Sequence, residues 1–172
     1  GSGPLDMRFD RTNHRTAADV VNELTESELA DIIYNYGEER RSRSIAKKIS
    51  QVRPLVTVSD LVEVVRSCTP PNYRHRTLAR VFQALRITVN EELEKLETFL
   101  KHFIDILAVG GKVVIISFHS LEDRLVKQQF RQLKENGRIR ILTKKPFRPK
   151  ADECKVNTRS RSAKLRAAER IF

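Results

Sequence analysis

The sequence has no tryptophan and only two cysteines in 172 residues. Cys68 and Cys154 lie far apart and lack the spacing of metal ligands. They favour a reduced, cytoplasmic setting and predict no metal site. No apolar run approaches the ~20 residues that a bilayer span requires, and no signal-peptide pattern opens the chain. We therefore expect a cytoplasmic protein without a membrane partner, and we treat Gly1 and Ser2 as a cloning remnant.

Glycine is also scarce, and its placement excludes one class of site. The six glycines are Gly1, Gly3, Gly37, Gly110, Gly111 and Gly137. None of them forms a G-x-G turn after a strand pattern, and there is no Walker loop. A cofactor site on a doubly wound sheet needs such a loop after its first strand. The sequence therefore predicts that no cofactor-binding residue lies in this chain.

Acidic residues are scarce near the C-terminus, where the positive charge is concentrated. Residues 138–172 contain twelve lysines and arginines against three acidic residues, a net charge of +9 out of +11 for the whole chain. A concentrated basic segment is typical of a surface that contacts nucleic-acid phosphates. A solvated basic tail is the alternative.

The first half of the chain predicts a helical subdomain over 16–76, after a lead-in at 1–15 without periodicity. Thr16 can cap one helix, and Thr25 with Glu28 forms a capping box for the next. Ser59 is expected to cap the last helix, which Pro70 and Pro71 end. The four predicted helices are 17–24, 26–35, 38–52 and 60–68.

The second half, 77–172, mixes helix and strand patterns. Apolar spacing predicts one long helix over 77–108, and β-branched residues at 112–117 indicate a buried parallel strand. A helix over 121–135 follows, then a half-exposed strand at 138–143 and a loop at 144–155. Residues 162–171 fit a strand better than a short helix. These elements predict the α/β class, with too few strands for a complete doubly wound sheet.

The turn after the 112–117 strand is the first place to look for a site, because ligands of open α/β sheets bind where strands end. His119 there can face a substrate, together with Ser117 and Ser120, or can serve as a capping or packing residue. Glu122 and Asp123 follow in the first helical turn, where carboxylates interact favourably with the helix dipole. A serine hydrolase is disfavoured because no G-x-S-x-G elbow is present.

Two further groups of polar residues are candidates for substrate contacts. Gln83, Arg86 and Asn90 lie on the long helix, where a solvated face is the alternative. The C-terminal basic residues alternate with serines, a pattern suited to phosphate oxygens. These four are Arg159, Arg161, Lys164 and Arg166.

Several motifs in order resemble those of the ribosomal RNA small-subunit methyltransferase H family (RsmH/MraW). They are GPLDMRFD, TAADVVNELTESELADIIYNYGEERRSRSIAKKI, VFQALRITVNEELEKLE, GGKVVIISFHSLEDRLVK, LTKKPFRP and NTRSRSAKLRAAERI. The resemblance covers nearly the whole chain. It implies an S-adenosylmethionine-dependent enzyme that methylates N4 of a cytidine in 16S rRNA, with 16S rRNA or the small ribosomal subunit as partner.

The resemblance also implies that the chain is only the C-terminal portion of such an enzyme. In the family, the first four strands of a class I, Rossmann-like methyltransferase sheet precede GPLDMR and carry the cofactor loop. The expected fold is thus a helical substrate-binding subdomain followed by the C-terminal half of that sheet. We expect no S-adenosylmethionine bound to this chain and no activity of the chain alone.

By resemblance, the candidate catalytic residues are Ser117, His119 and Ser120, beside the target base. Asp6 and Arg8 of the lead-in would close the crevice, and the basic C-terminus would hold rRNA phosphates. The other expected substrate contacts are Gln83, Arg86, Asn90, Phe118, Glu122, Arg159, Arg161, Lys164 and Arg166.

Two other interpretations stay open. The chain could be a non-catalytic RNA-binding module, or an interaction fragment that completes its sheet with another chain. An apolar strand at 112–117 without its neighbour would expose unpaired backbone groups, and such edges promote pairing. We therefore predict self-association, strand exchange or a local rearrangement at this edge.

Overall fold

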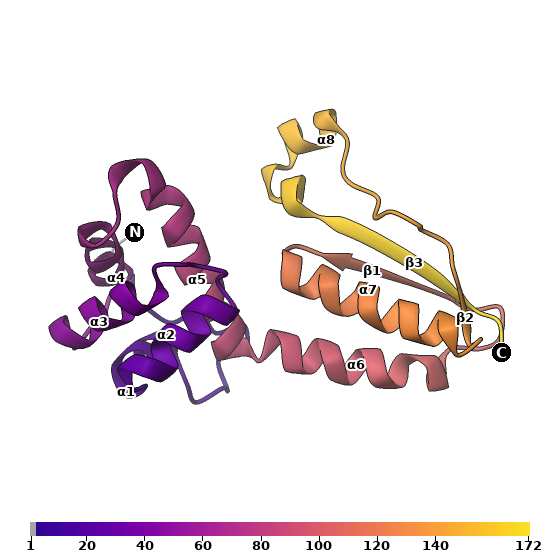
Figure 1. The fold of residues 1–172 in the computed structure, drawn as a ribbon, viewed down its shortest axis with the longest axis horizontal. Helices are drawn as coiled ribbons and strands as arrows, with labels where there is room; N and C mark the ends of the chain where they lie inside the picture. The colour runs from indigo at the N-terminus through magenta and orange to yellow at the C-terminus, as the bar shows by residue number, and fades with distance from the viewer. Residues whose placement is uncertain (1–2) are drawn as a thin grey trace. The chain divides into compact units, whose positions relative to one another are not determined.

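The computed structural model describes residues 3–172, which form two compact units that meet in the sequence between Glu92 and Leu93 (Figure 1). The first unit is helical: α1 (Ala17–Glu23), α2 (Glu26–Asn35), α3 (Ser42–Val52), α4 (Val58–Ser67), a 3-10 turn at Pro71–Tyr73 and α5 (Arg74–Asn90). The second contains α6 (Glu92–Ile106) from Leu93 onward, β1 (Lys112–Ser117), α7 (Ser120–Glu135), β2 (Ile139–Ile141), α8 (Ala151–Val156), a 3-10 segment at Thr158–Ser162 and β3 (Lys164–Arg170).

Three threonines begin helices of the first unit. Thr16 and Thr25 form the capping boxes of α1 and α2, so both predicted caps are confirmed. Thr57 forms a third box with Asp60 and begins α4, whereas we expected Ser59 to do so. The prediction was wrong because an extended residue whose hydroxyl reaches the N3 amide defines the cap, and Thr57 has that conformation.

The core of the helical unit is formed by the apolar stripes of α1–α5. The best-buried large side chains include Leu29, Ile33, Ile45, Ile49, Leu61 and Leu85. Gly37 lets the end of α2 approach α5 closely, because a Cβ there would lie 2.6 Å from the carbonyl oxygens of Arg80 and Ile33. The following residues therefore run directly beside α5, and α3 begins at Ser42 rather than at residue 38 as predicted.

The helix predicted over 77–108 is interrupted. Glu91 adopts a left-handed conformation, with φ of 52°, and separates α5 from α6. No glycine or proline marks the break; instead Asn90 bonds the backbone of the lead-in, as described below. Because α5 packs against α1, α2 and α4, the structural boundary follows α5, whereas the sequence placed it between residues 76 and 77.

The sheet of the second unit is antiparallel, in the order β1-β3-β2. Val114 lies opposite Ala167, and Ile116 lies opposite Leu165. The expectation of a parallel strand at 112–117 is therefore wrong. Its neighbour β3, predicted as a strand over 162–171, is confirmed and returns from the far end of the chain. In residues 3–172 no strand pairs with the other edge of β1.

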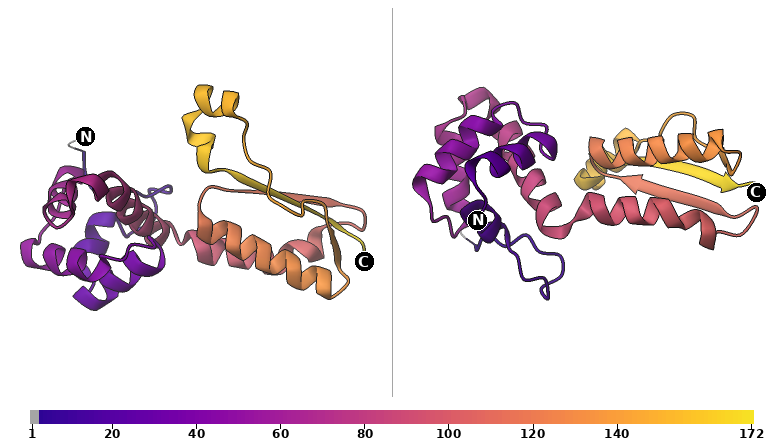
Figure 2. Two further views of the ribbon diagram at one scale, coloured as in Figure 1. Left: turned by 45° about the horizontal axis from the view of Figure 1, so that its top comes forward. Right: turned by 60° about the horizontal axis from the view of Figure 1, so that its bottom comes forward.

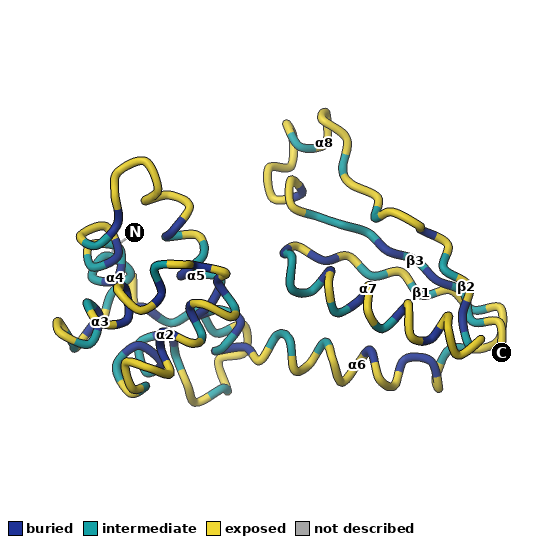
Figure 3. The backbone as a smooth tube through the Cα atoms, viewed as in Figure 1, coloured by how far each residue is buried: buried dark blue, intermediate teal, exposed yellow. Residues whose placement is uncertain are grey.

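Helices α6 and α7 pack on one face of this sheet (Figure 2). Phe103 of α6 and Phe130 of α7 meet at 6.1 Å between ring centroids, over Val113, Ile115 and Ala168. Val114 and Ile116, which alternate with Val113 and Ile115 on β1, point to the other face of the sheet. Exposure therefore alternates along the strand (Figure 3). The prediction of a buried strand was wrong for this reason: Val114 and Ile116 are 57% and 53% exposed.

Two smaller features complete the comparison. The segment predicted as a loop over 144–155 contains the short helix α8. No helix among residues 3–172 combines the length and apolar character needed to cross a membrane.

Candidate substrate-binding site

The turn between β1 and α7 is organised by His119. Its backbone is extended, and its Nδ1 accepts a hydrogen bond from the backbone N–H of Glu122 at 3.4 Å, so the imidazole caps α7. In return the Glu122 carboxylate accepts from the backbone N–H groups of Phe118, at 2.7 Å, and His119. Of the two roles that the sequence left open for His119, this geometry is that of a capping residue.

The neighbours of His119 differ in accessibility. Ser117 is buried at the end of β1, and Ser120 is half-buried as the first residue of α7. Phe118 is 50% exposed and is therefore accessible to a ligand. The turn therefore presents an aromatic surface beside a rigid capping box.

Asp123 pairs with two basic residues of β3. Its carboxylate accepts from Arg166 Nε at 2.7 Å and lies 3.2 Å from Lys164 Nζ. Burial raises the pKa of Asp123, but the hydrogen bonds from Arg166 and Lys164 outweigh it and hold this pKa below its usual value. Asp123 thus joins α7 to β3 and does more than interact with a helix dipole.

This pairing changes the interpretation of two predicted phosphate contacts. Arg166 is buried, and its guanidinium is bonded to Asp123, so it does not offer its charge to a phosphate at the surface. Lys164 is half-buried on the same carboxylate. Arg159 and Arg161 are exposed in the 3-10 segment, where they are accessible to a phosphate.

The lead-in of the helical unit is held by Asp6 and Arg8. The guanidinium of Arg8 donates to both carboxylate oxygens of Asp6, at 2.7 and 3.0 Å, and to the carbonyl oxygen of Asn13 at 2.6 Å. The hydrogen bond from Arg8 lowers the pKa of Asp6 to about 2. The two residues predicted to close a crevice thus bind each other and shape their own loop.

The three polar residues predicted on the long helix all lie on α5 and all make internal contacts. Asn90 donates to the carbonyl oxygen of Met7 and accepts from the N–H of Phe9, at 2.9 and 2.8 Å. Gln83 donates to the carbonyl oxygen of Tyr36 at 2.8 Å, and Arg86 binds Glu92 through two hydrogen bonds. All three side chains therefore have partners within the helical unit, and Asn90 holds the loop around Phe9.

Phe9 itself lies in that loop and is 72% exposed. Met7, two residues earlier, has a left-handed backbone with φ of 64°, a strained conformation for a non-glycine residue. Asn90 holds the loop on both sides of Arg8. The loop therefore presents a second exposed aromatic ring on a backbone that internal hydrogen bonds fix.

Comparison with known proteins identifies the family. The family model described as "MraW methylase family" matches residues 1–171. The chain belongs to the MraW methylase family. Relatives named "Ribosomal RNA small subunit methyltransferase H" include those of Trichodesmium erythraeum and Rippkaea orientalis, both 52% identical over 98% of this chain. The Synechococcus elongatus relative is 49% identical over the same share.

The chain covers only part of these MraW methylase relatives. It spans 60% of the Trichodesmium protein, 55% of the Rippkaea protein and 57% of the Synechococcus protein. The family identity therefore applies to this chain, which spans less than two thirds of the length of these relatives.

One feature of this MraW methylase chain was missed by the sequence interpretation. A cavity of about 540 Å³ in the helical unit is lined by seven residues from the α2–α3 connection, the 3-10 turn and the first half of α5. They are Glu39, Arg40, Arg41, Tyr73, Arg76, Thr77 and Arg80. The signal available in the sequence was the arginine pair after Gly37, together with arginines spaced four apart at 76 and 80.

Proposed function

We propose that this chain is part of an S-adenosylmethionine-dependent methyltransferase that modifies N4 of a cytidine in 16S rRNA. The observation that carries the proposal is 52% identity over nearly the whole chain to relatives named for methylation of small-subunit ribosomal RNA. The partner would be 16S rRNA or the small ribosomal subunit, which places the enzyme in the cytoplasm. The chain would supply a helical substrate-binding unit and the C-terminal strands of a class I, Rossmann-like sheet.

The chemistry of the proposed reaction defines what the protein must do. The exocyclic amine of cytosine is a poor nucleophile because its lone pair is delocalised into the ring. The enzyme must therefore take the base out of its stack and hold the amine in line with the methyl group. Aromatic side chains are the usual surfaces for such splayed bases.

The residues after β1 are suited to the positioning part of that task. Phe118 offers a half-exposed ring, and Ser117, His119 and Ser120 lie next to it on the rigid turn. The capping box between His119 and Glu122 fixes the backbone of this wall. In this proposal His119 is a positioning residue, whereas Phe118 contacts the base.

The β1–α7 turn does not fit the methyl donor. Donor sites of class I sheets use a glycine-rich turn between a strand and a helix, and the β1–α7 turn contains no glycine. The backbone N–H groups of Phe118, His119 and Glu122 are also bonded within the turn, to the side chains of Glu122 and His119. We therefore derive no step of the reaction through the donor, and we expect the chain alone to be inactive.

A chimera tests the proposed activity directly. The region of the Trichodesmium relative that matches this chain would be replaced by residues 1–172, and 16S rRNA methylated by the chimera would be digested for nucleoside mass spectrometry. The expected product is N4-methylcytidine. A folded chimera that methylates another atom, or nothing, would contradict the proposal.

Calorimetry tests the donor separately. We expect no heat of binding when S-adenosylmethionine is titrated into residues 1–172, and the chimera should bind it. Micromolar affinity of the chain alone would show that its own residues form a donor site, contrary to our interpretation.

A second candidate function is sheet completion with another chain, which the exposed side of β1 favours. This strand has a free hydrogen-bonding edge within residues 3–172, and Val114 and Ile116 are exposed. The third alternative, a non-catalytic RNA-binding module, uses the same basic surfaces as the enzyme. RNA binding of either kind should weaken by orders of magnitude between low and moderate salt, and a flat response would favour sheet completion.

A further inference from the structure

The arginine-lined cavity of the helical unit is the most distinctive surface that the proposed reaction does not use. Four arginines and one glutamate give its lining a net charge of +3. Its volume of about 540 Å³ lies within the usual range for ligand sites. All its lining residues belong to the helical unit, so its geometry depends on that unit alone.

The cavity is formed by local contacts between the α2–α3 connection and α5. The close approach at Gly37 brings residues 38–41 beside α5. The side chain of Glu39 is 2% exposed; its carboxylate accepts from the backbone N–H of Arg41 at 3.0 Å and lies 3.4 Å from Arg80 Nη1. Glu39 thus fixes one wall and neutralises one arginine, which leaves three arginines in excess.

The remaining arginines are placed for an external anion. Arg40 and Arg76 are exposed, and within residues 3–172 no carboxylate forms an ion pair with either of them or with Arg41. A guanidinium binds phosphate through paired N–H donors in a fixed plane. Like charges held together without counter-charges are stabilised when an anion binds between them.

Tyr73 adds an aromatic surface to the same cavity. The guanidinium carbon of Arg41 lies 4.9 Å from the ring centroid of Tyr73, a cation–π contact that orients both groups. Half of the Tyr73 surface nevertheless stays exposed. An anion subsite beside a half-exposed aromatic ring suits a nucleotide of a single strand. The arginines can bind its phosphate, and the ring can stack on a base.

We propose that this cavity binds single-stranded RNA, with a backbone phosphate held by Arg40 and Arg76 and a neighbouring base stacked at Tyr73. The inference rests on the proposed RNA substrate and adds a contact site in the helical unit to it. An acidic protein segment would also satisfy the arginines, but it would not need the aromatic ring. The ring therefore favours RNA.

The test measures binding of a fluorescein-labelled single-stranded RNA of about 12 nucleotides to residues 1–172 by fluorescence anisotropy at several salt concentrations. The variant Arg40→Gln/Arg76→Gln should weaken binding about tenfold or more. It should also reduce the slope of log affinity against log salt by about 0.7, the contribution of the one single-strand phosphate that the two arginines hold. Tyr73→Ala should weaken binding about tenfold with little change in the slope.

Matched controls separate the cavity from general charge and from exposed tyrosine. Arg43→Gln/Lys47→Gln removes the same charge from exposed positions of α3, and Tyr34→Ala removes an exposed tyrosine from α2. Neither lines the cavity, so both should change affinity less than about threefold. Circular dichroism confirms that each variant is folded.

The outcomes distinguish the site from the proposed function. If the chain binds RNA and the cavity variants match their controls, the cavity inference is overturned and the RNA substrate stands. If the unaltered chain binds no RNA at low salt, the proposed substrate fails, and the cavity inference fails with it. If a polyglutamate peptide displaces the RNA with equal affinity and Tyr73→Ala has no effect, the cavity is a site for acidic protein instead.

Discussion

Arg166 Nε lies 2.7 Å from Oδ1 of Asp123, and this contact joins the last strand of the sheet to the first turn of α7. The two residues are 43 positions apart in the sequence, and both are buried. The pair therefore closes the small sheet onto its helix, next to the turn at which we place the target base.

The first prediction concerns this ion pair. Asp123→Asn keeps the side-chain shape but leaves the buried Arg166 without a counter-charge, so it should lower the free energy of unfolding of the second unit by about 3 kcal/mol. Hydrogen exchange measured by mass spectrometry on peptides from α7 and β3 would report the loss.

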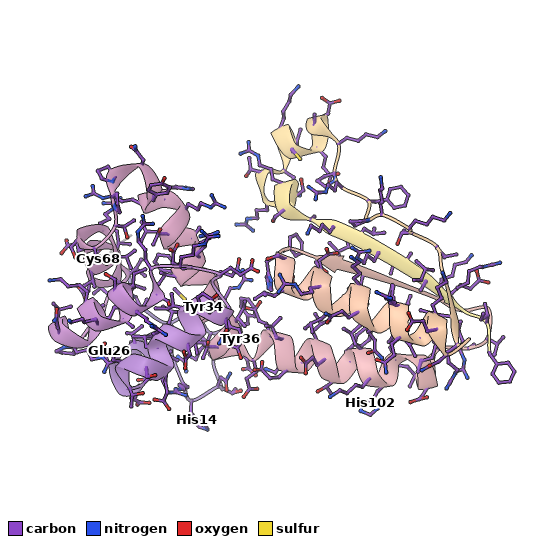
Figure 4. All side chains as sticks on the ribbon, viewed as in Figure 1. His14, Glu26, Tyr34, Tyr36, Cys68 and His102 are labelled. Carbon is purple, nitrogen blue, oxygen red and sulfur yellow. The ribbon has the colours of Figure 1, made fainter. Side chains whose placement is uncertain are left out.

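The sequence supplies an internal control for that measurement. All three tyrosines, Tyr34, Tyr36 and Tyr73, lie in the helical unit, and Figure 4 shows the first two near the end of α2. Tyrosine fluorescence should therefore keep its urea midpoint in Asp123→Asn. Glu135→Gln breaks an exposed pair with Arg131 and should cost less than about 0.5 kcal/mol. An equal effect of both substitutions would contradict the prediction.

The second prediction concerns the lead-in loop. Asn90→Ala removes the hydrogen bonds to Met7 and Phe9 and leaves two part-buried backbone groups without their partner, at a cost of about 1–2 kcal/mol in the helical unit. Urea unfolding followed by tyrosine fluorescence measures it. The exposed Gln51→Ala on α3 is the control, and a cost no greater than that of Gln51→Ala would show that Asn90 does not hold the loop.

The third prediction concerns acid. Hydrogen bonds from the capping threonines hold the pKa of Asp19, Glu28 and Asp60 below their usual values. The unfolded chain therefore takes up protons first as pH falls. The stabilisation is fully present well above the ordinary pKa values of these groups, 3.8 for aspartate and 4.5 for glutamate, and it is lost as pH falls through their lowered pKa values in the folded chain.

Urea unfolding of the helical unit between neutral pH and about pH 3 tests whether its stability falls as the pH falls. The midpoint should fall with acid, and the triple variant Asp19→Asn/Glu28→Gln/Asp60→Asn should show a weaker dependence. If the unaltered unit were as stable at the acid end as at neutral pH, the capping boxes would contribute no pH dependence.

The fourth prediction concerns the exposed side of the sheet. We expect the chain to self-associate through the free edge of β1, where apolar side chains and unpaired backbone groups coincide. Ile116→Lys should shift sedimentation toward the monomer, whereas Val156→Lys adds the same charge at a 92% exposed position of α8 and should not. A chain that stays monomeric at all concentrations would refute the prediction.

Local signals predicted the fold well where short-range chemistry decides it. The threonine boxes at Thr16 and Thr25 and the breaker at Gly137 act within a few residues of themselves, and the structure has helix ends at each. The break at Glu91 could not be predicted from local sequence. It follows Asn90, whose side chain is bonded to Phe9, 81 positions away in the sequence. The parallel pairing predicted for β1 was wrong for the same reason, because its partner β3 is remote in the sequence.

The local structure around the candidate site was predicted, whereas the contacts of its side chains were not. The turn at Phe118 and His119 follows a strand as expected, and that much comes from local pattern. The capping role of His119 and the buried pairing of Arg166 depend on which groups the fold brings opposite them. The charge of the sequence therefore predicted a basic surface but not which arginines lie on it. In the structure Arg159 and Arg161 are exposed, whereas Arg166 is buried.

Gly37 provides a means to separate shape from charge in the helical unit. A single methyl group at this position meets two carbonyl oxygens that belong to backbone and have little freedom to move. Gly37→Ala would thus displace the arginine wall while every ionic group is retained. A ligand that recognises only the total charge of the surface would tolerate that displacement, and one that needs a fixed spacing of donors would not.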